Sequence, residues 1–344
     1  MKSEGRQRFV RVTFLGDTLV GGEAQTTLDE HGPGYAFDGI SHLFARSDFV
    51  VANHEGPITC RDQLDPKLDI GRKRYWYRAE PDSAAALRDV GVRVVSLANN
   101  HVMDHGPHGL EDTTRTLDRA GIQWCGAGPT RRVARRPAVV DCQGMRFGFL
   151  SFMQRYDLYV AERLYATKSK PGPLRLSLAR ARADFAKLRP EVDVCVALVH
   201  WGRNYRKRNP RQVRLAAELR GAGADLVVGH HPHIPQPISI LDRAPVCYSL
   251  GNGPLGTPGR FHSGRPPYGL VATFDFDPTG AVRRIAVESI LVDNAQVGFR
   301  PRVAADDTAR GVLRRLLPAE LEWRESPGEG LVAEVPRTDP VATP

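Results

Sequence analysis

Short apolar runs alternate with helix-like segments along the first two thirds of the chain. Runs typical of buried strands occupy 9–15, 48–53, 92–98, 192–200 and 225–229. Segments with apolar residues at helical spacing occupy 81–91, 109–121, about 174–189 and 211–223. Residues 138–152 predict a hairpin that turns near Gln143 and Gly144. Because strands and helices alternate, we expect an α/β sandwich with a largely buried sheet, whose first strand ends where Gly16 breaks the apolar run.

The pattern changes after residue 237. Successive strand-like runs follow one another without helices between them, which indicates antiparallel additions to the sheet. Residues 253–267 are rich in Gly and Pro and predict a loop, and the chain beyond about 318 is polar and proline-rich. We therefore expect an N-terminal extension over 1–8, one domain over 9–300, and a C-terminal segment over 301–344 that ends in a loose tail.

The buried runs stop at residues of a particular kind. Five of them end in a carboxylate, a carboxamide or an imidazole. These groups are Asp17, Asn53 with Glu55, Asn99 with Asn100 and His101 (Asp104 and His105 follow), His200, and His230 with His231 and His233. In open α/β sheets, ligands bind outside the carboxyl ends of the strands. Each residue alone is compatible with a turn or a hydrogen-bonded core histidine, but five such strand ends together favour one shared site.

Metal binding is the chemistry that this mixture of side chains favours. Carboxylate oxygens combined with imidazole nitrogens suit Mn, Fe or Zn better than Mg or Ca, which prefer oxygen ligands alone. Two divalent metal ions about 3.5–4 Å apart, bridged by a carboxylate, would use this many ligands. The alternative for the crowded run His230, His231 and His233 is a polar turn.

Composition narrows the class of protein. Hydrophobic residues make up 41% and charged residues 25% of the 344 positions, as in a globular protein with a substantial core. No run approaches the roughly 18–20 apolar residues of a membrane helix, and the first 17 residues lack the features of a signal peptide. We therefore expect no membrane segment and a cytoplasmic location. The five cysteines contain no CxxC pair, so we expect buried, reduced thiols at Cys60, Cys125, Cys142, Cys195 and Cys247.

The net charge is +9, and arginines concentrate in 131–136 and 203–211. Basic clusters bind nucleic acid, anionic surfaces or acidic substrates. No aromatic ladder or nucleic-acid motif accompanies either cluster, which disfavours a nucleic-acid partner. For 131–136 we favour a solvated surface. The second cluster follows His200 directly, so Arg203, Arg206, Lys207 and Arg208 either attract a polyanion at the mouth of the site or form an exposed loop without a role.

Six motifs occur in a recognisable order: FLGD, DFVVANHEGPIT, SLANNHVMDHG, VHWGRNY, GADLVVGHHPHIPQP and YSLGN. Over roughly residues 9–292 this order resembles the CapA-type proteins, a family named after the poly-γ-glutamate capsule biosynthesis protein. The resemblance implies a calcineurin-like metallophosphatase fold, which is a β-sandwich flanked by helices in four α-β-β-α layers. It also implies two divalent metal ions at the strand ends.

The resemblance assigns roles to individual residues. The implied metal ligands are Asp17, Glu55 in the bridging place, Asn100, His200, His231 and His233. His101 would be the adjacent catalytic histidine, and Asp104 would either support it or cap the following turn. The candidate substrate-binding residues are Asn53, Asn99, Arg203 and Arg206, and His230 is expected behind the ligands.

Three positions depart from the usual family patterns. Leu19 stands where related phosphoesterases usually have a histidine, so one metal is expected to be held more weakly or differently. Asn204 replaces the glutamate of the common HWGxEY motif, and Gly253 replaces a large residue after YSLGN. These differences disfavour a standard capsule role and favour a related biosynthetic or tailoring pathway.

These features predict a metal-dependent hydrolase or transferase that acts on an anionic small-molecule or peptide-like substrate. The expected chemistry is related to poly-γ-glutamate, at a γ-glutamyl, amide or phosphate group. His101 would act as general acid or charge stabiliser, because imidazole titrates near neutrality. Two other functions stay open: a dinuclear-metal phosphoesterase, and a non-catalytic accessory partner in a polymer-synthesis complex. A nucleic-acid-binding protein, the least favoured alternative, would bind in a salt-dependent manner without the metal.

Overall fold

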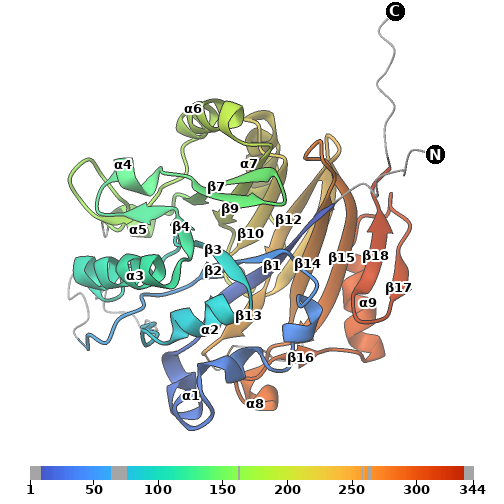
Figure 1. The fold of residues 1–344 in the computed structure, drawn as a ribbon, viewed down its shortest axis with the longest axis horizontal. Helices are drawn as coiled ribbons and strands as arrows, with labels where there is room; N and C mark the ends of the chain where they lie inside the picture. Colours follow the sequence, from blue (N-terminus) through green and yellow to red (C-terminus); the bar gives the residue numbers. More distant parts are fainter. Residues whose placement is uncertain are drawn as a thin grey trace, which may run out of the picture.

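The computed structural model describes residues 9–62, 76–161, 163–257, 259, 261 and 265–336, and Figure 1 shows two large sheets with helices around them. The strands are β1 (Val10–Leu19), β2 (Phe49–His54), β3 (Val92–Ser96), β4 (Gln123–Cys125), β5 (Ala127–Gly128), β6 (Ala138–Cys142), β7 (Met145–Met153), β8 (Gly172–Pro173), β9 (Val194–His200), β10 (Leu226–His230), β11 (Pro235–Leu241), β12 (Ala244–Leu250), β13 (Asn252–Leu255), β14 (Tyr268–Phe276), β15 (Val282–Leu291), β16 (Arg302–Val303), β17 (Arg324–Ser326) and β18 (Gly330–Glu334). The α-helices are α1 (Gln25–His31), α2 (Ser83–Asp89), α3 (Gly106–Ala120), α4 (Arg131–Ala134), α5 (Asp157–Ala161), α6 (Leu178–Leu188), α7 (Pro210–Gly221), α8 (Asn294–Val297) and α9 (Asp307–Leu316).

The strands form two large sheets and one small pair. The ten-stranded sheet has the order β17-β18-β15-β14-β1-β2-β3-β4, with β13 beside β1 and β16 beside β15. The six-stranded sheet has the order β11-β12-β10-β9-β7-β6, and β5 pairs with β8. Strands β1 to β4 run parallel, as do β7, β9, β10 and β12, whereas β14 and β15 pair antiparallel. The expected antiparallel additions are therefore confirmed for β14–β15 and for the β11–β12 hairpin.

An aromatic core fills the space between the sheets. Side chains alternate in direction along a strand, so Phe49 and Val51 of β2 face the second sheet while Val50 and Ala52 face the helices. The Phe49 ring packs edge to face against Phe147 of β7, with centroids 5.3 Å apart. Burying a side chain of this size contributes about 1.5–3 kcal/mol, so the facing sheets hold each other in register.

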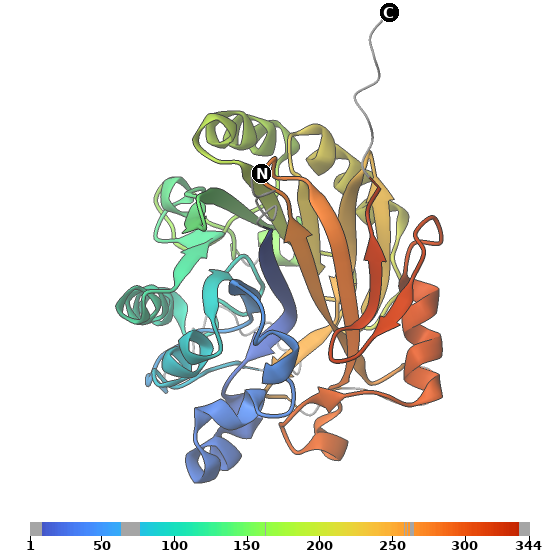
Figure 2. The ribbon, with the colours of Figure 1, turned by 45° about the vertical axis from the view of Figure 1, so that its right-hand side comes forward.

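Helices cover the two outer faces. Apolar side chains of α1, α2 and α3 pack on the outside of the ten-stranded sheet, and those of α6 and α7 pack on the outside of the six-stranded sheet. Figure 2 shows α9 on the side of the molecule opposite α3. The layers run helix, sheet, sheet, helix, which confirms the expected α-β-β-α architecture.

The first strand is longer than the sequence suggested. We expected the apolar run to break at Gly16, but β1 continues to Leu19 with a bulge between Phe14 and Asp17. A Cβ atom at position 16 would lie 2.1 Å from the Gly251 carbonyl oxygen, so only glycine permits this approach. Glycine here marks a close strand contact instead of a strand end.

The expected loose tail is wrong for residues 324–334. Strand β18 pairs antiparallel with β15, and β17 pairs with β18, which extends the ten-stranded sheet. Leu331, Val332 and Ala333 are all buried, so a short apolar run inside a polar region is enough to hold this hairpin. The extension 1–8 and the last positions, 337–344, lie outside the described residues. The proposed domain boundary at residue 300 stays a prediction.

Two further expectations concern thiols and membranes. All five cysteines are free, and four are buried, but Cys60 is exposed because it follows the end of the packed segment at Thr59. Among the described residues, no helix combines the length and the apolar character that crossing a bilayer requires.

Candidate functional site

The parallel strands of both sheets direct their carboxyl ends to one site. From the ten-stranded sheet come Asp17 within β1 and Glu55 directly after β2. The six-stranded sheet contributes the last residue of β9, His200, and two residues after β10, His231 and His233. All five side chains are buried although each is polar. Segments separated by up to about two hundred residues therefore meet in one place, as the strand-end pattern predicted.

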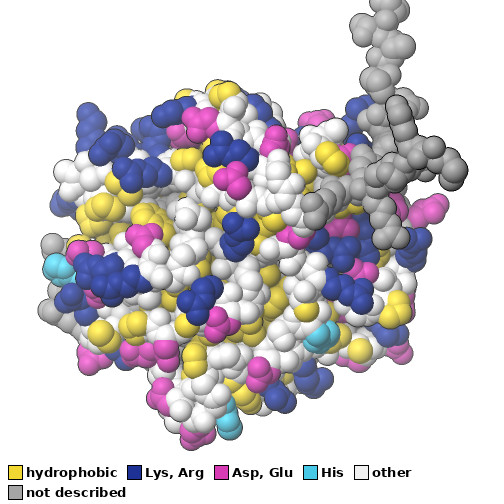
Figure 3. All heavy atoms as spheres, viewed as in Figure 1, with side chains coloured by type: hydrophobic (Ala, Val, Ile, Leu, Met, Phe, Trp, Pro, Cys, Tyr) yellow, Lys and Arg dark blue, Asp and Glu magenta, His cyan; other side chains and the backbone are white. Residues whose placement is uncertain are grey.

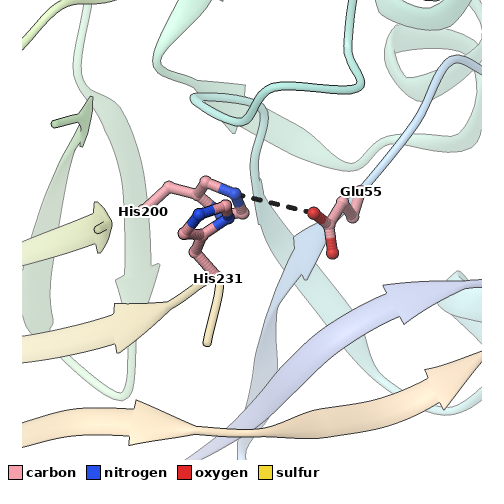
Figure 4. Close-up of side chains that lie close together, drawn as sticks. All are labelled: Glu55, His200 and His231. Carbon is pink, nitrogen blue, oxygen red and sulfur yellow. Dashed lines mark ion pairs between the residues drawn. The ribbon is translucent and has the colours of Figure 1, made fainter. Parts of the chain in front are cut away.

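These side chains form two overlapping triads that share Glu55. One triad is Glu55, His200 and His231, and the other is Asp17, Glu55 and His233; in each, the donor atoms lie within 4.8 Å of one another. Figure 4 shows the three side chains of the first triad pointing toward one another. His200 Nε2 lies 3.5 Å from Glu55 Oε1. His233 Nδ1 lies 3.5 Å from Asp17 Oδ2 and 3.9 Å from Glu55 Oε2.

Several donor atoms in the triads lack hydrogen-bond partners among the described residues. Both carboxylate oxygens of Glu55 and Nδ1 of His231 are buried and form no hydrogen bond. A buried polar atom without a partner is costly, and native proteins rarely leave several together. A cation between these donors would satisfy them. The mixed oxygen and nitrogen donor set also fits a divalent transition metal.

The electrostatics of the site point the same way. Burial raises the pKa of Asp17 to about 7, although hydrogen bonds from the His231 backbone and the Asn53 side chain oppose this effect. Burial, together with the charges of Asp17 and Asp104, raises the pKa of Glu55 well above its usual range. Burial and neighbouring histidines lower the pKa of His200 and His231 well below 6.5. The imidazoles are therefore neutral, which is the form that binds metals, and ionised carboxylates here require a nearby positive charge.

The loop after β10 is held in an unusual backbone conformation. The backbone angle φ is 96° at His231 and 57° at His233, and residues other than glycine rarely adopt positive values of this angle. The His231 amide donates to Asp17 Oδ2 at 3.0 Å, which anchors the loop to β1. Such strain costs about 1–3 kcal/mol per residue and concentrates at functional sites. The simple polar turn that the sequence left open does not require it.

Two asparagines brace the triads. Asn100 Oδ1 lies 2.7 Å from His200 Nε2, on the side of the imidazole that faces Glu55. Asn53 donates from Nδ2 to Asp17 Oδ1 at 2.8 Å and lies 3.5 Å from His200 Nδ1. Asn53 is fully buried and therefore acts on the site's own side chains.

A second cluster adjoins the triads. His101 Nδ1 lies 2.7 Å from Asp104 Oδ2, and the backbone amide of Tyr77 donates to the same oxygen at 2.9 Å. The Tyr77 ring stacks on His101 with centroids 3.8 Å apart. Asn99 accepts from the His101 amide at 3.1 Å and donates to the His54 carbonyl at 2.7 Å. The imidazole is thus fixed by a carboxylate, a ring and a braced backbone.

The remaining predicted residues lie farther out. His230 approaches the Leu15 carbonyl through Nε2 at 3.2 Å and belongs to neither triad. Arg203 and Arg206 are exposed on the loop between β9 and α7. Between them, Tyr205 donates its backbone amide to Pro232 at 2.7 Å, which holds this loop against the histidine loop.

The sequence did not single out four residues that contact the site. Asn252 Oδ1 lies 2.9 Å from His233 Nδ1, and the rings of Tyr156 and Tyr205 lie 5.4 and 5.6 Å from His231 and His233. Tyr77 is the fourth. Asn252 and Tyr205 end the quoted motifs YSLGN and VHWGRNY, which were the available signals, whereas Tyr77 and Tyr156 follow no strand-end pattern.

The departures at Leu19 and Gly253 have structural consequences. Leu19 is buried in the apolar core, so it offers the second triad no donor. A Cβ atom at Gly253 would lie 2.9 Å from Thr18 Oγ1, so glycine lets β13 approach β1 and brings Asn252 level with Asp17. Asn204 is exposed, and its motif position therefore adds no carboxylate to the buried site.

A family profile described as "Bacterial capsule synthesis protein PGA_cap" matches residues 11–253, which include every residue of the two triads. The chain belongs to this family. Members with curated descriptions include the capsule biosynthesis protein CapA of Bacillus anthracis, 32% identical over 70% of this chain and 58% of that protein. The PGA biosynthesis protein CapA of Bacillus subtilis is 29% identical over 70% of this chain and 62% of its own length.

Other similar proteins broaden the comparison. A probable polyglutamine synthesis accessory protein of Mycobacterium tuberculosis is 36% identical over 60% of this chain and 55% of that protein. The match of this PGA_cap member thus spans less than two thirds of the length of these relatives. A solved structure described as a novel phosphatase from Mycoplasma pneumoniae superposes with a TM-score of 0.52 at 12% identity, covering 84% of this chain and 95% of that one. This likeness supports the shared fold.

Proposed function

We propose that the protein is a metal-dependent hydrolase or transferase that acts on an anionic substrate in γ-glutamyl, amide or phosphate chemistry related to poly-γ-glutamate. One observation carries this proposal: Glu55 is shared by two buried donor triads, and neither of its oxygens has a hydrogen-bond partner among the described residues. A purely structural core has little use for a carboxylate placed in this way, because its burial is costly. A pair of cations held by the two triads would give both oxygens a partner.

Each proposed cation would have its own ligands. One would be held by Glu55, His200 and His231, with Asn100 beside His200 as a further oxygen donor. The other would be held by Asp17, Glu55 and His233, with Asn252 nearby. When bound, two divalent ions such as Mn, Fe or Zn would supply Lewis-acid activation of water and of the substrate's electrophilic group. The second set holds one histidine instead of two, so we propose that it binds its ion more weakly than the first set does.

The chain's own residues then handle the proton. We assign the proton on Nδ1 of His101 to the hydrogen bond with Asp104, because a carboxylate only accepts. This leaves Nε2 to take up or release a proton on the side away from Asp104. Stacking on Tyr77 prevents rotation of the ring, so the proton is presented in one direction. His101 is therefore proposed as the general acid or charge stabiliser, and Asp104 and Tyr77 as positioning residues.

The substrate side of the site is basic. Arg203 and Arg206 are exposed and lie on the loop that Tyr205 anchors beside His233. Their guanidinium groups would attract a carboxylate or phosphate toward the buried donors. Asn53 and Asn99 were candidates for substrate contact, and their hydrogen bonds support a role in holding Asp17 and His101 instead.

Two alternatives remain. The first is a phosphoesterase that uses the same donors on phosphomonoesters or diesters; the description of the Mycoplasma structure as a phosphatase favours it. The second is a non-catalytic partner in a polymer-synthesis complex, which the word "accessory" in the mycobacterial relative's name favours. Such a partner would keep the fold and perform no turnover.

One assay separates these functions. Protein stripped with EDTA and then supplied with Mn²⁺ or Zn²⁺ is offered p-nitrophenyl phosphate, bis-p-nitrophenyl phosphate and γ-glutamyl-p-nitroanilide. Metal-dependent release from the γ-glutamyl compound, abolished by Glu55→Gln, supports the main proposal. Release from the phosphate esters alone supports the phosphoesterase. Metal-loaded protein that turns over none of the three supports the accessory role and overturns the enzyme assignment.

A further inference from the structure

Two cavities rich in cations open on the surface that carries α4 and α6. The larger has a volume of about 790 Å³, and its cations include Arg131, Arg132, Arg136, Lys168 and Lys187. The smaller has a volume of about 280 Å³ and is lined by Arg131, Arg163, Lys170, Arg175 and Arg180. Arg131 lines both, so the cavities adjoin. In Figure 3, Lys and Arg side chains gather at the upper left, where Figure 1 places α4 and α6.

These cations lack acidic partners within the described part of the chain. None of the nine forms an ion pair there, whereas Arg11 and Arg61 on other faces bind Asp275 and Asp112 at 2.7 Å. The larger cavity contains two acidic side chains: Asp184, which Arg135 already neutralises with two nitrogens, and Glu191. Crowded like charges without counterions repel one another and attract anions. The solvated surface favoured from the sequence for 131–136 does not explain why the cations surround two cavities.

The smaller cavity is connected to the metal centre. Tyr165 lines this cavity, and its hydroxyl accepts from the Tyr156 amide at 2.9 Å and donates to the Gln154 carbonyl at 2.6 Å. The Tyr156 ring in turn packs against His231, with centroids 5.4 Å apart. One short segment of chain therefore has the basic cavity on one side and a candidate metal ligand on the other.

Further cations lie along this connection. Nη2 of Arg211 donates to the Arg155 carbonyl at 3.2 Å, and the Tyr156 hydroxyl donates to the carbonyl of Gly202, the residue before Arg203, at 2.9 Å. Arg155 itself is ion paired with Asp157. Arg211 and Arg203 therefore lie beside the segment that joins the smaller cavity to the candidate metal ligand His231.

We propose that these cations form a binding track for a polyanionic peptide chain with a carboxylate on most of its residues, extending from the α4–α6 surface toward the metal centre. The track extends the proposed function and rests on it, because the metal centre defines the end toward which the track runs. It assigns to this surface the capture of a long chain, while the buried donors act on one bond of it. Short anions would contact the metal centre alone.

The chemistry of the lining favours a carboxylate chain over a nucleic acid. Proteins bind single-stranded nucleic acids with exposed aromatic platforms between the cations. Among the residues lining the two cavities, the aromatic side chain is Tyr165, which is buried and uses its hydroxyl internally. Six of the nine cations are arginines, whose planar forks pair with carboxylates through two hydrogen bonds.

The test measures binding in EDTA, so that the metal centre does not contribute. Fluorescently labelled polyglutamate of about 50 residues, triglutamate and a single-stranded oligonucleotide of matched charge are compared by anisotropy at several salt concentrations. The expected result is that polyglutamate binds at least about tenfold more tightly than triglutamate and more tightly than the oligonucleotide. Equal affinity for the long and short peptides overturns the track, and preference for the oligonucleotide overturns its assignment to carboxylates.

Variants locate the binding on the protein. Arg131→Gln combined with Arg175→Gln removes one charge shared by both cavities and one from the smaller, and we expect polyglutamate affinity to fall about fivefold or more. Arg119→Gln is the matched control, because Arg119 is exposed on α3 and forms no ion pair within the described residues. Its affinity stays within about twofold of the unmodified protein. Equal losses in the control overturn the location.

Two further measurements distinguish a failure of the track from misfolding of a variant and from a failure of the proposed function. If the double arginine variant melts at a lower temperature, a second variant replaces it: Lys168→Gln combined with Lys170→Gln. Both lysines are exposed on the same rim, and we expect this variant to show the same loss of polyglutamate affinity. Turnover of the small chromogenic substrates reports on the metal centre alone. Polyglutamate binding without turnover upholds the track and overturns the enzyme, whereas turnover without selective polyglutamate binding upholds the enzyme and overturns the track.

Discussion

Replacing Glu55 by glutamine keeps the shape of the side chain and removes its ability to carry charge. In the folded, metal-free protein, burial and the charges of Asp17 and Asp104 raise the pKa of Glu55 well above 4.5, whereas the unfolded chain ionises near 4.5. An acid with a raised folded-state pKa destabilises the protein as the pH rises above the unfolded value. At pH 7 this cost is at most about 3 kcal/mol, from 1.36 kcal/mol for each pH unit. Glutamine does not ionise, so the variant lacks this free-energy cost.

The size of the chain converts this free energy into a melting temperature. Unfolding entropy is about 2.1 cal/mol/K per residue, so 344 residues give about 0.7 kcal/mol/K. In EDTA, Glu55→Gln is therefore expected to melt up to about 4 °C above the unmodified protein. With Mn²⁺ at about one hundred times its dissociation constant, the unmodified protein gains about 2.7 kcal/mol, or about 4 °C, and the variant gains almost nothing.

Differential scanning calorimetry with and without Mn²⁺ measures both effects in one experiment. Glu30→Gln is the matched control, because Glu30 is exposed on α1 and should change neither value by more than about 1 °C. If Glu55→Gln melts well below the unmodified protein in EDTA, the carboxylate stabilises the fold by itself. If the variant keeps the full Mn²⁺-dependent gain, Glu55 is not a ligand. Either result refutes the reasoning.

Three further predictions concern other parts of the structure. Asp104→Asn removes the carboxylate 2.7 Å from His101, so kcat on whichever of the three chromogenic substrates is turned over should fall about 100-fold with metal content unchanged; loss of metal would instead make Asp104 part of the metal centre. Gly16→Ala places a Cβ atom 2.1 Å from the Gly251 oxygen, so urea denaturation should show a loss of about 3 kcal/mol, and an unchanged midpoint would contradict the close strand approach. Leu331→Ala should cost about 2–3 kcal/mol by the same measurement, because Leu331 is a buried residue of β18; no effect would mean that the hairpin is loose in solution.

The sequence revealed the edge of the sheet at which the site forms. Each buried run ended in a polar residue, and parallel strands bring their carboxyl ends together, so Asp17, His200 and His233 were expected as neighbours. The sequence did not reveal which side chains would brace them. Tyr77 and Tyr156 reach the site from loops whose course depends on tertiary packing, and no local pattern records that.

Two local patterns were misleading for physical reasons. Gly16 is read as a strand end in isolation, because its partner at Gly251 lies far away in the sequence. The hairpin near Leu331 was hidden within a polar, proline-rich region, where a few apolar residues complete a sheet edge that the rest of the chain provides. The arginines of 131–136 likewise became informative only when α6 placed further cations beside them.

The position of the cations in crystals soaked with Mn²⁺ tests the central claim most directly. We predict two anomalous scattering peaks on either side of the Glu55 carboxylate, one beside His200 and His231 and the other, weaker, beside Asp17 and His233. Peaks elsewhere, or fully supplied crystals without a peak at Glu55, would contradict a two-cation centre built on this shared carboxylate.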